Sequence, residues 1–160
     1  MATRRLTEEA HFVSAVVPIN TTGAAQSGDW VNMKRYRRAL IVIQQGAWAG
    51  GTSAVTVNQA TANDGTGSKA VSFTEKYEGV ALTDDILAEV AVSSNTFDLD
   101  TANEFHIIEI DPTHLDRDNG FDHIQVALAS PGANADLVSA LYILYDGDFV
   151  HDPTNHKTAL

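Results

Sequence analysis

Short runs of β-branched and other apolar residues recur along the whole chain, separated by glycine, asparagine, aspartate and proline. Runs of this kind are typical of β-strands joined by tight turns. The pattern predicts eight strands, near residues 11–18, 39–45, 53–60, 69–75, 87–93, 104–111, 121–129 and 137–146. Only residues 83–85 resemble the start of a helix, because two acidic residues fall in a possible first turn. The sequence therefore predicts a mainly β protein.

About eight short strands with regular turns favour an antiparallel β-sandwich or jelly roll over alternating βαβ units. Most of these strands alternate apolar and polar positions, which predicts one buried and one solvated face. Strands 39–43 and 140–145 are instead apolar on both faces. This predicts that they are central strands whose outer face is also covered. A loop, an arm or another subunit could supply that cover.

The chain divides by composition into one domain and two polar ends. Its 160 residues fit a single domain. Residues 1–10 are polar and lack a strand pattern, so we interpret them as an N-terminal arm, with the sandwich over 11–149 and a C-terminal tail over 150–160. Ends of this kind are disordered in isolation unless something ties them down.

The absence of cysteine excludes disulfides and thiolate metal sites. No apolar run approaches 18 residues, so we expect no transmembrane helix and no membrane partner. Glu8, Glu9 and His11 interrupt the segment where a secretory signal would need an unbroken apolar stretch, so we expect no such signal. Stability must then come from packing or assembly.

Charge is distributed unevenly along the chain. The formal net charge is -11, yet residues 1–40 carry six basic and three acidic side chains, while residues 41–160 carry four basic and eighteen acidic ones. The first part is therefore +3 and the second -14. A dipolar chain of this kind suits docking on a charged protein surface, or on copies of itself, better than attraction to a polyanion.

No recognised catalytic or cofactor motif is present. The segment 65–69 (GTGSK) has serine before lysine and is followed by a predicted strand, so it is a hairpin loop rather than a phosphate loop. The acidic segment 111–122 is the best metal candidate, but counting from Asp116 it lacks the glycine and glutamate positions of a calcium loop. The six histidines show no ligand spacing. We therefore expect no enzyme activity, no cofactor and no metal.

Four of the ten basic residues lie within five positions, around one tyrosine, in the segment 28–46 (GDWVNMKRYRRALIVIQQG). Alternation along a strand would place Lys34, Tyr36 and Arg38 on one face and Arg35 and Arg37 on the other. A nucleic-acid site gathers its cations on one face of a positive domain, so we expect no nucleic-acid partner. A solvated strand edge and a protein contact both remain possible. The candidate interface residues are Arg4, Arg5, Lys34, Arg35, Tyr36, Arg37 and Arg38.

With that segment in view, the chain resembles small virion structural proteins of tailed bacteriophages, including capsid decoration (cement) proteins. The resemblance extends to residues 51–73 (GTSAVTVNQATANDGTGSKAVSF), 105–129 (FHIIEIDPTHLDRDNGFDHIQVALA) and 141–149 (LYILYDGDF). It depends on overall texture and turn placement and on no catalytic motif. It implies a β-sandwich or jelly-roll domain that binds the outside of an assembled head, commonly as a trimer.

The resemblance thus predicts a non-enzymatic protein, made in the host cytoplasm, that stabilises the capsid by bridging capsomers on the outer surface of the virion. Its expected partners are the major capsid protein and further copies of itself, as a homotrimer. A tail or head–tail connector component is the first alternative. A glycan-binding sandwich is the second, with Trp30 and Trp48 as exposed stacking platforms.

Overall fold

A computed structural model of the chain describes residues 5–80 and 86–147. Within these ranges nearly all regular structure is β. The elements in chain order are α1 (Leu6–Glu9), β1 (His11–Asn20), β2 (Gln26–Ser27), β3 (Val31–Asn32), β4 (Tyr36–Trp48), β5 (Ser53–Ala60), β6 (Lys69–Ala70), β7 (Glu75–Val80), β8 (Ala88–Ala91), β9 (Thr96–Leu99), β10 (Glu104–Ile110), the 3₁₀ turns η1 (Pro112–His114) and η2 (Arg117–Asn119), β11 (His123–Leu128) and β12 (Asp136–Gly147).

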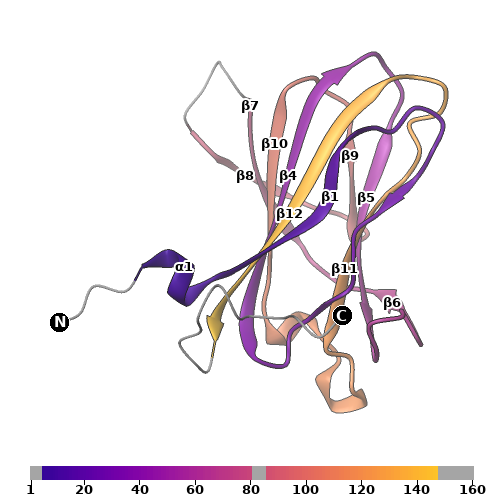
Figure 1. The fold of residues 1–160 in the computed structure, drawn as a ribbon. Helices are drawn as coiled ribbons and strands as arrows, with labels where there is room; N and C mark the ends of the chain where they lie inside the picture. Colours follow the sequence, from indigo (N-terminus) through magenta and orange to yellow (C-terminus); the bar gives the residue numbers. More distant parts are fainter. Residues whose placement is uncertain (1–4, 81–85, 148–160) are drawn as a thin grey trace.

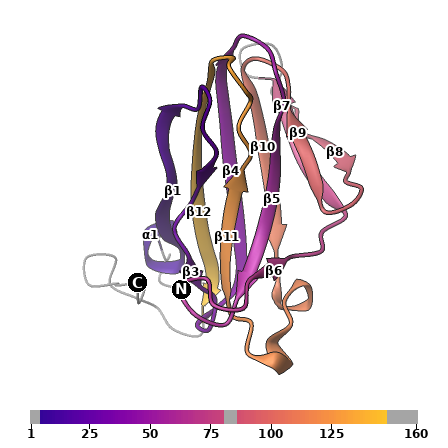
Figure 2. The same ribbon diagram turned by 90° about the vertical axis from the view of Figure 1, so that its right-hand side faces the viewer.

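The strands form two antiparallel sheets that face each other (Figures 1 and 2). Sheet A has the order β1-β12-β4-β10-β7-β8. Sheet B has the order β2-β11-β5-β6, with β3 also paired to β11 and β9 to β5. The predicted mainly β, antiparallel architecture is confirmed, and two facing sheets are consistent with the predicted sandwich. The described chain contains twelve strands rather than eight.

The strand pairs are nested along the sequence. The first strand pairs with the last, β2 and β3 pair with β11, β4 pairs with β10, and β5 pairs with β9. The chain therefore behaves as one long antiparallel hairpin that is folded over into two layers. The β12–β4 pairing then joins the pair β1–β12 to the pair β4–β10, so that all four strands lie in sheet A.

The core fills the space between the sheets and follows from period-two alternation. In β5, Val55 and Val57 are fully buried while Ala54, Thr56 and Asn58 are half-buried, as the pattern predicts. In β4 the inward residues are Ala39, Ile41 and Ile43, all with no exposed surface. Sheet B contributes the facing side chains of β11, so each layer covers the apolar side of the other.

The hydroxyl of Tyr142 places a polar atom inside this core. The ring belongs to β12 and is fully buried, and its oxygen accepts a hydrogen bond of 2.7 Å from the backbone N–H of Val126 in β11. Burial raises the pKa of this tyrosine. The contact ties sheet A to sheet B through a donor that would otherwise be buried without a partner.

Several expected boundaries are wrong. The predicted strand 69–75 is divided into β6 and the start of β7, with no strand between them. The segment holding β2 and β3, and the strands β7 and β9, were not predicted. The polar arm includes the short helix α1 and ends at the buried Ala10. The expected helix start at 83–85 and the tail 150–160 lie outside the described residues.

We expect Tyr142→Phe to lower the free energy of unfolding by about 1–3 kcal/mol, because the buried N–H of Val126 loses its acceptor. Urea denaturation followed by tryptophan fluorescence measures this change. The matched control is Tyr77→Phe on the outer face of sheet A, where we expect less than about 0.5 kcal/mol. Equal stability of Tyr142→Phe and the parent would contradict the role of this hydroxyl.

Candidate functional site

The outer face of sheet A carries a continuous apolar surface. Across neighbouring strands, Leu141, Val42 and Ile107 are paired in register, and so are Phe12, Ile143 and Leu40. Their side chains are half-buried or exposed, whereas their immediate neighbours along each strand point into the core. We define the apolar face by seven residues: Phe12, Leu40, Val42, Phe105, Ile107, Leu141 and Ile143.

The outer face of sheet B has the opposite character. There Asn58 is paired with Gln125, and Thr56 with Ala127. These side chains are half-buried, and three of the four are polar. One side of the sandwich therefore has an ordinary solvated surface, while the other presents apolar side chains over four adjacent strands. Contiguous apolar surface of this kind marks interaction sites more often than solvent-facing structure.

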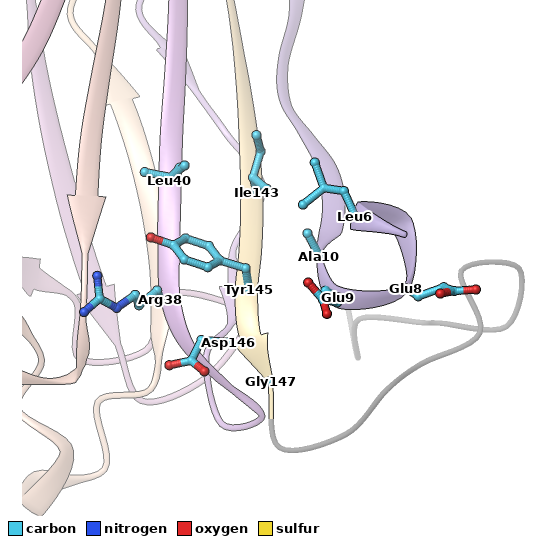
Figure 3. Close-up of a pocket in the computed structure, with 10 residues that line it drawn as sticks. All are labelled: Leu6, Glu8, Glu9, Ala10, Arg38, Leu40, Ile143, Tyr145, Asp146 and Gly147. Carbon is cyan, nitrogen blue, oxygen red and sulfur yellow. The ribbon is translucent and has the colours of Figure 1, made fainter. Parts of the chain in front are cut away.

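A groove lies at one end of the apolar face, between α1 and sheet A (Figure 3). Its volume is about 780 Å³. Leu40, Ile143 and Tyr145 form the side contributed by the sheet, and Leu6 and Ala10 form the side contributed by the arm. The charged residues at its margin are Glu8, Glu9, Arg38 and Asp146. The arm thus forms one side of a groove next to the two strands that the sequence predicted to be covered on both faces.

The basic cluster is largely engaged within its own chain. Lys34 lies 3.1 Å from Asp122, and Arg38 donates a 2.7 Å hydrogen bond to Glu109. The hydroxyl of Tyr145 donates to the same Glu109 oxygen at 2.5 Å. The carboxylate of Glu109 therefore links three neighbouring strands, β10, β4 and β12, at one end of the apolar face.

Tyr36 corrects the proposed interface. It is only 3 % exposed and belongs to the core, so it is not a surface residue. The strict alternation expected from Lys34 onward is wrong because Lys34 lies in a turn, where the N–H of Tyr36 donates to the carbonyl of Met33. The ring of His11 then stacks on Tyr36, with 6.3 Å between centroids.

The other candidate interface residues are at the surface or outside the described chain. Arg35 and Arg37 are exposed beside this turn. Arg5 is exposed and precedes α1, and its backbone N–H donates to Glu8 at 2.9 Å. Arg4 lies outside the described residues.

The acidic segment considered for metal binding is occupied by other contacts. Asp116 forms an ion pair with Lys69 and accepts a hydrogen bond from Asn119. Asp122 contacts Lys34 on one side and the ring of His123 at 2.5 Å on the other. Over residues 5–80 and 86–147, no three histidine or acidic side chains gather as a metal site.

A buried charged cluster lies inside the edge of the sandwich. Lys76, from β7, donates to Nδ1 of His106 at 3.2 Å and also contacts Glu78. Nε2 of His106 lies 3.2 Å from Glu104 but outside hydrogen-bond geometry. Burial, and secondarily the positive charge of Lys76, lower the pKa of His106 to about 4. Sequence reasoning missed this cluster, although both Lys76 and His106 occupy inward positions.

The platforms of a glycan-binding module are not in place. Trp30 and Trp48 are both half-buried rather than exposed. Trp30 lies just before β3, which is followed by the turn that leads into β4, and Trp48 is the last residue of β4. A strand of thirteen residues spans about 40 Å, so the two rings cannot stack on one sugar.

No protein-family model matches the chain, and no curated protein matches it. No helix within the described ranges is long and apolar enough to cross a membrane.

The buried cluster predicts a loss of stability in mild acid. Unfolded histidine takes up a proton near pH 6.5, whereas folded His106 stays neutral down to about pH 4. The unfolded state therefore binds more protons than the folded state between these two pH values. The free energy of unfolding is highest above pH 6.5 and decreases as the pH falls toward 4. We expect this group alone to remove roughly 3 kcal/mol across the window.

The measurement is urea denaturation at several pH values for the parent and for His106→Gln. Glutamine can accept the hydrogen bond of Lys76 but does not titrate. The variant should therefore show a shallower fall in stability, because the neighbouring carboxylates of Glu78, Glu104 and Asp100 are the same in both proteins. Parallel curves for the two proteins would contradict the assignment to His106.

Proposed function

We propose that this chain is a non-enzymatic structural protein that binds another protein surface through the apolar face of sheet A. The observation that carries the proposal is the difference between the two outer faces. A solvated sheet normally alternates apolar-in and polar-out, as sheet B does. On β4 and β12 the middle outward positions, Leu40, Val42, Leu141 and Ile143, are apolar as well, and their removal from water in a complex would be favourable.

The charges favour a protein partner over a polyanion. The net charge of -11 repels a phosphate backbone. Two of the four clustered cations, Lys34 and Arg38, already pair with carboxylates of their own chain. An apolar centre with charged groups at its margin is the usual composition of a protein interface.

The partner that we propose is the outer surface of a phage capsid, as the sequence resemblance implies. We also propose that the sandwich is a jelly roll, which the nested pairing of β1 with β12 and β5 with β9 supports. A protein that binds only the assembled shell stabilises that shell by mass action. Repetition over many lattice sites turns modest contacts into high avidity.

A tail or head–tail connector component is the second candidate, since the same face would serve assembly there. The glycan-binding alternative is disfavoured because the two tryptophans are half-buried and are separated by β3 and the whole length of β4. Copy number distinguishes head from connector, because a decoration protein occupies every lattice site and a connector forms a single ring of about a dozen copies.

We expect Val42→Lys to weaken binding to capsids at least tenfold, because the variant places a charge at the centre of the apolar face. Co-sedimentation with capsids stripped of the protein measures binding. The matched control is Thr56→Lys, which adds the same charge at a half-buried outward position of sheet B and should bind as the parent does. Unchanged binding of Val42→Lys would rule out the apolar face as the docking surface.

A further inference from the structure

The helix α1 has a basic residue at its beginning and acidic residues at its end, so two copies of it in antiparallel orientation have complementary charges. Arg5 lies at its beginning, Leu6 follows, and Glu8 and Glu9 end it. Two such helices placed antiparallel would bring the cation of each beside the anions of the other. Opposed charges in register add specificity and orientation to a contact between proteins.

The helix is exposed on its own chain. None of its four residues is buried, and the side chain of Leu6 is 64 % exposed. The following residue, Ala10, is 2 % exposed and anchors the end of the helix against the sandwich. An apolar side chain that is exposed at the edge of a groove is available to a partner.

The two acidic residues of α1 have different surroundings. Glu8 accepts the backbone N–H of Arg5 and points away from the sheet (Figure 3). Glu9 is exposed and lies on the side of α1 that faces β12 (Figure 3). Glu9 is therefore the carboxylate best placed to meet a cation that enters the groove.

The groove itself selects for an apolar side chain accompanied by a cation. Leu40 and Ile143 make its inner wall apolar. Arg38 is already paired with Glu109 at 2.7 Å. The other charged residues that line the groove, among those that the structure describes, are the acidic Glu8, Glu9 and Asp146.

We propose that the groove binds α1 of a second copy of this chain, and that the contact is reciprocal. Leu6 of each copy enters the groove of the other, and Arg5 of each copy pairs with Glu9 of the other. The inference deepens the proposed function, because it assumes that this end of the apolar face is a docking surface. A reciprocal contact has two-fold symmetry and closes at two copies. It therefore predicts a dimer rather than the trimer that the resemblance implies.

The test is sedimentation velocity of the purified full chain up to about 100 µM, where a complex of micromolar Kd is fully formed. We expect the parent to be a dimer. Arg5→Glu and Glu9→Arg should each weaken association at least tenfold, because each places like charges opposite one another. An equimolar mixture of the two variants should recover the dimer, since one partner then carries only anions at these positions and the other only cations.

The double variant Arg5→Glu/Glu9→Arg should also dimerise, because it restores opposite charges in every copy. Asp98→Arg, in the exposed part of β9, changes the net charge as Glu9→Arg does and should leave the dimer intact. Recovery by mixing cannot arise from a folding defect, which would persist in the mixture.

A parent that remains monomeric, a trimer, or single variants that associate like the parent would each overturn the proposal. Failure of the mixture to recover the dimer would overturn it as well. The assay contains no capsid, so its result is independent of whether Val42→Lys impairs capsid binding. If the protein is a dimer but does not bind capsids, the proposed function is wrong and the contact between copies is supported. If it binds capsids as a monomer, the contact between copies is wrong and the proposed function is supported.

Discussion

The pairing of β4 with β12 is the interaction on which the rest of the structure depends. Its ladder runs from Trp48 opposite Asp136 to Tyr36 opposite Gly147. It joins segments about a hundred residues apart. Bringing these segments together costs loop-closure entropy before their contacts can stabilise the sheet. Once the ladder exists, β12 offers its other edge to β1, and β4 offers its other edge to β10. Sheet A is assembled around these two strands.

The same two strands are apolar on both faces, and this leaves their register weakly determined by hydrophobicity alone. A slip of one residue would exchange Ile41 and Ile43 with Leu40 and Val42, and either set could fill a core. Polar contacts distinguish the two registers. Arg38 and Tyr145 meet on the outer face at the carboxylate of Glu109, while the hydroxyl of Tyr142 reaches the N–H of Val126 across the core.

The sequence predicts those parts of the fold that long apolar runs determine by themselves. The expected strand 53–60 coincides with β5, because alternation and flanking turns agree there. The strands β2 and β3 have two residues each, so they have no period to detect and exist only through their pairing with β11. The strand β7 contains Lys76 and Gly79, which disfavour a strand locally. One of the groups that pairs with Lys76 is His106, which lies on another strand, β10, so the local sequence does not reveal it. The burial of Tyr36 depends on a turn and on His11, neither of which spacing reveals.

The size of the apolar face indicates how it would be used. Four strands about 4.8 Å apart and five residues of about 3.3 Å rise cover roughly 300 Å². At about 25 cal/mol per Å² this area is worth at most some 7 kcal/mol, and less because its side chains are already partly covered. Association costs at least about 4 kcal/mol in lost freedom. A single copy would then bind weakly through this face alone. Added contacts at its charged margin, or repetition over many identical sites, are what would convert such a surface into stable attachment.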